Sequence, residues 1–409
     1  MEKTIKQDIV KTKSLLCGLQ DVKKSFETVS SNIKREVEHI QNMQAKEIPV
    51  IPEIDYKSIL NGSVSNSQIA DIKRRGSLII RDVFDEQQAR DWNDEVVEYI
   101  LRNDYYTKSI EREGMDQYFS QLKSGAPQIF GIYWSKPQMI ARQSNSMANT
   151  KKFLNSLWDV SCPSGIEFDP NHDYVYADRI RRREPGDITL GLSPHIDGGS
   201  FERWVDSAFQ KVYGSVFNGD CPAYDPWKAA YRTQTREYKS PAVCSMFRTF
   251  QGWTALTSQG PSDGTLSVIP IANAMSYILL RALQKDILPD SLCDAEPGRP
   301  LNISSKYHKE LMDGLVSIQE VKPGDTVWWH PDVTHSVADR HSGKDYSNVM
   351  FIGASPKCQK NLNYVRKQTQ RFLQGKSPPD FAAEDYEVDF NGRFMVEELT
   401  DLGRTQMAL

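Results

Sequence analysis

The chain has 409 residues, a formal net charge of −4 and 25% charged residues, a length that allows one large or two ordinary domains with a buried core. The slightly acidic balance argues against a broad basic surface for nucleic acid, and no stretch is long and uncharged enough to span a membrane. The first twenty residues lack the apolar block of a secretory signal, and the six cysteines form no Cys-x-x-Cys pair, so we expect reduced thiols and a cytoplasmic protein.

Residues 1–47 carry apolar side chains at helical spacing, with lysine and glutamate between them. This pattern predicts one or two amphipathic helices, weakened near Gly18 and at Ser30–Ser31. With the proline-flanked connector that follows, residues 1–55 are expected to form a helical arm. The arm packs either on the body of the protein or on a second copy, so a homo-oligomer formed through it is one expectation.

The next segment combines a helix, a strand and a second helix. Residues 68–75 are predicted to be helical and to stop at Gly76. Residues 77–84 are rich in branched and aromatic side chains, which is typical of a strand. Asp85 is a suitable N-cap for a helix over residues 86–102.

From about residue 172 short strand-like runs alternate with glycine and proline turns, and a tryptophan- and tyrosine-rich insertion over residues 200–240 interrupts them. The runs expected to be strands are residues 173–182, 187–192, 242–256, 264–271, 315–321, 326–330 and 348–352. Many short strands with helical insertions predict a mainly β fold, a double-stranded β-helix (jelly-roll, cupin-like) core over about 172–358 flanked by helices. We expect one domain over residues 56–358, then residues 359–409 with a helix over 359–373 and a partly disordered acidic tail.

His195 and Asp197 are the first candidate metal ligands. In an extended segment residues i and i+2 point to the same side, so these two side chains can bind one ion. Gly198 and Gly199 follow and are expected to turn the backbone away and leave space over the site. A His-x-Asp pair by itself is a weak signal, because a simple His–Asp hydrogen bond in a turn is more common.

A second motif supplies the third candidate ligand. Residues 322–336 predict a turn, a buried aromatic strand, a Pro-Asp turn and then His335 re-entering the fold. His330 is an alternative third ligand, although a buried histidine bonded to backbone explains it well. Two histidines and one carboxylate leave adjacent positions vacant on an octahedral metal, the arrangement of non-heme iron(II) oxygenases. Zinc would more often receive four protein ligands, or three and a water.

Three motifs in order resemble the phytanoyl-CoA dioxygenase-like branch of the iron(II)/2-oxoglutarate oxygenases. They are His195–Asp197, residues 263–270 and residues 323–335, and residues 72–84 resemble the opening helix and strand. Within that branch, residues 178–199 and 248–256 look like a family of unknown function found in bacteria and fungi. The resemblance covers about residues 68–360. It implies that His195, Asp197 and His335 are the catalytic iron ligands, that His335 is the distal one, and that 2-oxoglutarate and O2 are cosubstrates.

The anchor for 2-oxoglutarate departs from the family pattern. The family places an arginine about ten residues after the distal histidine, whereas residues 347–352 contain no basic residue. A buried dicarboxylate needs a cation, preferably a bidentate arginine, and Arg248 is the preferred substitute. Ser336, Lys344 and a wall formed by Trp253 are further expected cosubstrate contacts.

The arginine-rich run over residues 179–183 has two interpretations. The simpler is a solvated strand edge, and the alternative is a surface that attracts an anionic substrate. The aromatic residues of the insertion are candidates for a lid or substrate pocket, or for a self-packed unit.

The sequence thus predicts an oxygenase that hydroxylates a small molecule and releases succinate and CO2, and an anionic substrate is one of the expectations. Two alternatives stay open. One is a metal-dependent isomerase or hydrolase of the cupin type, and the other is a barrel that binds a small molecule without catalysis.

Overall fold

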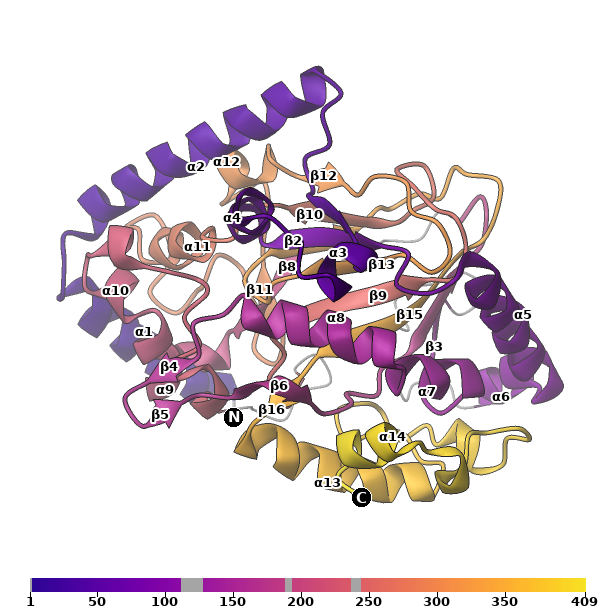
Figure 1. Ribbon diagram of the computed structural model, residues 1–409. Coiled ribbons are helices and arrows are strands. Elements are labelled where there is room, and N and C mark those ends of the chain that lie inside the picture. Colours follow the sequence, from indigo (N-terminus) through magenta and orange to yellow (C-terminus); the bar gives the residue numbers. More distant parts are fainter. Residues whose placement is uncertain (1, 112–127, 188–192, 237–243) are drawn as a thin grey trace.

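Two β-sheets form the centre of the protein in the computed structural model, which describes residues 2–111, 128–187, 193–236 and 244–409 (Figure 1). The seven-stranded sheet has the order β1 (Glu53–Asp55), β2 (Ser77–Arg81), β13 (Thr326–Trp329), β9 (Phe250–Ala255), β15 (Ser347–Ala354), β7 (Ile180–Arg183) and β3 (Ile129–Phe130). The five-stranded sheet has the order β11 (Pro300–Asn302), β8 (His195–Ser200), β14 (Thr334–Val337), β10 (Leu266–Ile269) and β12 (Val316–Ser317). Neighbouring strands are antiparallel except for the pair β1 and β2.

The two sheets face each other, and helices cover their outer sides. The rings of Trp329 and His335, one from each sheet, lie 5.1 Å apart. On the far side of the seven-stranded sheet, Trp328 belongs to an apolar cluster with side chains of α5 (Glu86–Arg102) and α8 (Asn145–Ser156). The five-stranded sheet is covered by α11 (Met275–Ala282) and α12 (Lys309–Met312), over which α2 (Val22–Ala45) runs (Figure 1).

The remaining elements are short. They are α3 (Tyr56–Leu60), α6 (Tyr105–Glu111), α7 (Lys136–Arg142), α9 (Ser207–Val212), α10 (Gly214–Phe217), β4 (Ser161–Cys162), β5 (Gly165–Ile166), β6 (Asp169–Asp173) and β16 (Pro356–Lys357), with 3₁₀ turns among them.

The N-terminal arm forms two helices, as predicted. The first, α1 (Glu2–Cys17), ends at Gly18, and Asp21 caps α2 by accepting a hydrogen bond from the amide of Lys24. The apolar face of α2 is buried against the body of the same chain. This is the first of the two expected packing modes, and assembly of two copies through the arm stays a prediction.

Local signals placed several other boundaries correctly. Helix α4 (Asn66–Arg75) ends at Gly76, which has a φ of 63°. A Cβ there would lie 2.7 Å from a methyl carbon of Val333, so both the turn and the close packing require glycine. Asp85 caps α5 by accepting from the amide of Gln88.

Two expectations about the architecture were wrong. Within the described residues helix outweighs strand, 41% against 19%, so the fold is mixed α/β and not mainly β. Residues 173–182 do not form one strand, because only β6 and β7 are strands there, and residues 188–192 of the next expected strand lie outside the described residues.

The C-terminal tail is folded and not partly disordered. Helix α13 (Gln359–Leu373) has the predicted bounds, and the chain then returns to α14 (Asp401–Gln406) beside it (Figure 1). Phe394 and Met407 are buried and share a cluster with Trp134. Scattered aromatic residues thus give the acidic tail enough apolar surface to pack. Among the described residues, no helix combines the length and the apolarity that crossing a membrane requires.

Candidate metal centre

Three side chains converge at the inner face of the five-stranded sheet. His195 and His335 stand opposite each other on β8 and β14, and Asp197 follows His195 on the same side of its strand. Nε2 of His195 lies 3.7 Å from one carboxylate oxygen of Asp197, and Nε2 of His335 lies 3.5 Å from the other. One ligand atom from each residue lies within 4.8 Å of the others, a spacing that one metal ion can bridge.

Backbone carbonyls orient both imidazoles. Nδ1 of His195 lies 2.7 Å from the carbonyl oxygen of Ser193, and Nδ1 of His335 lies 3.2 Å from that of Val333. A proton on each Nδ1 leaves the lone pair on Nε2, the atom that faces Asp197. This arrangement, in which a backbone acceptor fixes the tautomer, is typical of metal-binding histidines.

The electrostatics favour the ligand forms of the side chains. Burial, followed by the neighbouring His195, lowers the pKa of His335 to about 4, so its ring is neutral near pH 7. Burial opposes ionisation of Asp197, but His335, His195 and Arg248 outweigh it and lower the pKa of the carboxyl. The site therefore offers a neutral imidazole on His335 beside a carboxylate on Asp197.

His330, the alternative third ligand, has a structural role. Its Nδ1 accepts from the amide of Asp332, its Nε2 donates to the carbonyl of Pro226, and its ring stacks on Trp158 at 4.6 Å. Both ring nitrogens are occupied by hydrogen bonds, and His330 is not part of the candidate metal cluster found among the described residues.

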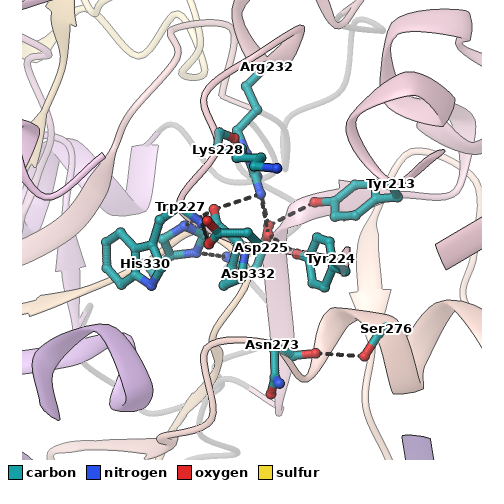
Figure 2. A network of polar contacts seen from close by, with 11 residues as sticks. Tyr213, Tyr224, Asp225, Trp227, Lys228, Arg232, Asn273, Ser276, His330 and Asp332 are labelled. Atoms are coloured by element: carbon teal, nitrogen blue, oxygen red, sulfur yellow. Dashed lines mark hydrogen bonds and ion pairs between the residues drawn. The ribbon is translucent and has the colours of Figure 1, made fainter. Parts of the chain in front are cut away.

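A buried polar network holds the turn between β13 and β14 (Figure 2). Asp332, with no exposed surface, accepts from the hydroxyls of Tyr213 and Tyr224 at 2.8 and 2.9 Å. Its carboxylate also accepts two hydrogen bonds from Arg232, the shorter at 2.7 Å. The network joins the insertion to the turn that precedes His335.

Gly198 and Gly199 have a role that only partly matches the one expected. Both belong to β8, and the amide of Gly198 donates to the carbonyl of Pro331 at 2.7 Å. A Cβ at Gly198 would lie 2.2 Å from a carboxylate oxygen of Asp332. Gly198 therefore permits close packing of the β13–β14 turn, and the backbone does not turn away there as expected. Both glycines line the pocket beside Asp197, as the expected open space requires.

A pocket opens beside Asp197. Its wall combines the end of β8, the insertion, the segment before β9 and the start of α13, and includes Arg203, Phe209, Tyr213, Arg248, Gln251 and Lys360. Two aromatic residues of the insertion thus face the pocket, whereas Trp204 and Phe217 pack on each other in the core at 5.8 Å. The insertion is partly a pocket wall and partly a self-packed unit.

The other expected cosubstrate contacts are dispersed. Arg248 lines the pocket with Asp197, but Trp253 lies in the core of the seven-stranded sheet, paired with Val327 and Phe351. Ser336 pairs with Ser267 and alternates with His335, so it points to the opposite face of its sheet. Lys344 is exposed in the loop before β15.

The interpretation of residues 179–183 as a solvated edge was wrong. Strand β7 lies between β15 and β3, and Arg181 and Arg183 are only 5% and 0% exposed. Arg183 reaches the carboxylate of Asp187 at 3.4 Å. Nη2 of Arg181 donates to the carbonyl of Gly264, just before β10, so its side chain crosses from one sheet to the other. Alternation within the run could have indicated that both side chains share a face.

Three comparisons place the chain among known proteins. The sequence profile of the Gig2-like family matches residues 3–409. The protein YbiU of Escherichia coli (strain K12) is 42% identical over 398 residues, which cover 97% of this chain and 94% of YbiU. A crystal structure from Salmonella typhimurium LT2, named "Putative Oxidoreductase", is 42% identical with a TM-score of 0.94 and covers 99% of this chain and 97% of its own.

A fungal structure is also similar. GlcNAc Inducible Gene 2, GIG2 (DUF1479), from Candida albicans is 28% identical with a TM-score of 0.81, over 98% of this chain and 89% of its own. The expected resemblance to a bacterial and fungal family is confirmed. Membership of the phytanoyl-CoA dioxygenase-like branch is not shown by these relatives and stays a prediction.

Proposed function

The chain belongs to the Gig2-like family, and from that premise we propose that it is an iron(II)- and 2-oxoglutarate-dependent oxygenase of a small molecule. The observation that carries the proposal is the cluster of His195, Asp197 and His335, with ligand atoms within 4.8 Å. The name of the Salmonella relative agrees with a redox role.

The order of the strands supports this function. The seven-stranded sheet contains the run β13-β9-β15-β7 and the five-stranded sheet contains the run β8-β14-β10-β12. Consecutive strands from β7 to β10 alternate between the two sheets, and so do β12 to β15. This alternation is the winding of a double-stranded β-helix, which we propose for the core, with the candidate ligands on its two adjacent strands β8 and β14.

The donor set fits iron(II). Two imidazoles and a carboxylate on one side of an ion leave neighbouring positions for a cosubstrate and oxygen, and this set is the facial triad of non-heme iron oxygenases. His195, Asp197 and His335 would hold the metal, and the carbonyls of Ser193 and Val333 would keep the rings oriented. Trp329 packs on His335 and limits access of water from the core side.

The surroundings also fit a dicarboxylate cosubstrate. Strand β15 carries no basic side chain. Two buried arginines could instead meet a far carboxylate: Arg181, which reaches from β7 to the carbonyl of Gly264, and Arg248, which lines the pocket with Asp197. When bound, iron and 2-oxoglutarate supply the oxidation: O2 provides one oxygen atom to a substrate C–H bond and one to the succinate formed with CO2. The protein holds the ligands, orients them and shapes a pocket beside Asp197.

Metal content and coupled turnover test the proposal. Wild type should retain one iron per chain, and so should His172→Ala, which alters an exposed histidine outside the cluster. Asp197→Ala and His335→Ala should lose iron, together with 2-oxoglutarate-dependent oxygen uptake and succinate formation. Iron retained in both cluster variants would contradict the ligand assignment. Tight metal binding without succinate would indicate a metal-dependent isomerase or hydrolase instead.

A further inference from the structure

The pocket beside Asp197 is lined by more cations than anions. Arg203, Arg232, Arg248 and Lys360 contribute to its wall, and Asp197 is the one acidic side chain among the described residues that do so. Iron bound to Asp197 would neutralise that negative charge. The pocket is therefore electropositive where a substrate must approach the metal.

Each of the four cations has a different set of partners. Arg232 forms a buried ion pair with Asp332 at 2.7 Å. Arg203 donates to the backbone carbonyl of Asp197, and Lys360 donates to that of Thr235. Arg232 is thus neutralised by a carboxylate of the protein itself.

Arg248 has no such carboxylate. It is 9% exposed, donates to the amide oxygen of Gln251 at 3.2 Å and lies over the ring of Tyr176 at 5.0 Å. Within the described parts of the chain no carboxylate reaches ion-pair distance of its guanidinium. A desolvated guanidinium with unused donors is costly unless an anion joins it, and the open pocket is where that anion can enter.

Arg181 provides the complementary position for the cosubstrate. Its side chain crosses the space between the sheets to Gly264, four residues before Val268, which pairs with His335. It also has no carboxylate at ion-pair distance among the described residues, and it lies on an inner strand while Arg248 lines the open pocket. Arg181 thus lies between the two sheets, and Arg248 lies in the wall of the open pocket beside Asp197.

We infer that the substrate is a small molecule with a carboxylate or phosphate group that Arg248 binds in the pocket, while Arg181 meets the far carboxylate of 2-oxoglutarate. This inference rests on the proposed function for the roles of metal and cosubstrate. It moves the expected anchor from Arg248 to Arg181.

Two simple anions test the pocket. Binding of acetate and of inorganic phosphate to the full chain is followed by NMR, with 2-oxoglutarate both absent and saturating. Wild type should bind at least one of them, and Arg248→Met should weaken that binding by about tenfold, the effect of losing a charge-assisted hydrogen bond. Arg248→Lys should recover part of it. The preferred probe distinguishes a carboxylate site from a phosphate site.

Two further variants show whether the effect depends on the position of Arg248. Gly353→Ala places a Cβ 2.9 Å from Cδ of Arg248 and should weaken anion binding without removing the charge. Arg281→Met alters an arginine paired with Asp286 outside the pocket and should leave binding unchanged. Equal anion binding in wild type, Arg248→Met and Gly353→Ala would overturn the assignment.

An anaerobic titration of iron-loaded protein with 2-oxoglutarate tests the inferred role of Arg181 as the cosubstrate anchor. The dissociation constant should rise by about tenfold or more in Arg181→Met and by less than about threefold in Arg248→Met. The reverse order would return the anchor to Arg248 and overturn the inference. A wild type that shows no 2-oxoglutarate complex would reject the proposed function, whereas the anion measurements would still decide whether Arg248 binds an anion.

Discussion

The two walls of the pocket treat a buried arginine in opposite ways. On the wall formed by the insertion and the β13–β14 turn, Arg232 shares its charge with Asp332 and two tyrosine hydroxyls supply further hydrogen bonds. On the wall before β9, Arg248 has an amide oxygen and an aromatic ring but no described carboxylate at ion-pair distance. The first arrangement stabilises the fold, and the second leaves binding capacity for a ligand.

The largest effect should follow from removal of Asp332. Asp332→Ala leaves Arg232 buried without its counter-charge, so we expect a loss of about 3–5 kcal/mol in the free energy of unfolding, measured in urea. Asp286→Ala serves as the comparison, because Asp286 is the exposed ion-pair partner of Arg281. Its loss should lower the free energy of unfolding by at most about 1 kcal/mol. A loss below about 1 kcal/mol in Asp332→Ala would show that the pair does not stabilise the insertion.

A pH dependence of intermediate size should come from the same pair. Burial opposes ionisation of Asp332, but the charge of Arg232, with the hydrogen bonds, lowers the pKa to about 2 from an ordinary value near 3.8. Because the folded-state pKa is depressed, the stabilisation is present above pH 4 and is lost as the pH falls from about 4 to about 2. The expected loss is about 2 kcal/mol.

Unfolding experiments on wild type and Asp332→Asn check this effect over that range. The difference in stability between the two proteins should shrink with acidification, since the variant carries no ionisable group at this position. A difference in the free energy of unfolding that stays constant from pH 5 to pH 2 would contradict a stabilising role for the ionised Asp332.

The smallest effect on stability should follow from Arg248→Met. Since no protein carboxylate is left unpaired, the free energy of unfolding should change by less than about 1 kcal/mol, while Arg232→Met should cost about 3 kcal/mol or more. Equal losses in the two variants would remove the contrast between the walls.

The candidate centre could be predicted from sequence because its information is local. His195 and Asp197 occupy one side of one strand, and the motif ending at His335 carried a family resemblance. The choice between His330 and His335 needed the fold, since the partners of His330 are Pro226 and Trp158. Helix ends at Gly76 and Asp85 were also predictable from capping rules.

What could not be predicted depends on distant packing. Arg181 and Arg183 are buried because β3 and β15 enclose their strand, and a run of arginines gives no sign of this. Asp332 meets Arg232 across one hundred residues of chain. The tail is folded because apolar side chains such as Phe394 and Met407 are buried. No periodic pattern in the sequence predicts their burial.

The absorption of the iron-loaded protein under anaerobic conditions, titrated with 2-oxoglutarate, tests the central claim most directly. A metal-to-ligand charge-transfer band should grow to a plateau at one cosubstrate per iron and be absent in Asp197→Ala. Iron-loaded wild type that develops no such band would contradict the claim that His195, Asp197 and His335 hold an iron with vacant positions for 2-oxoglutarate.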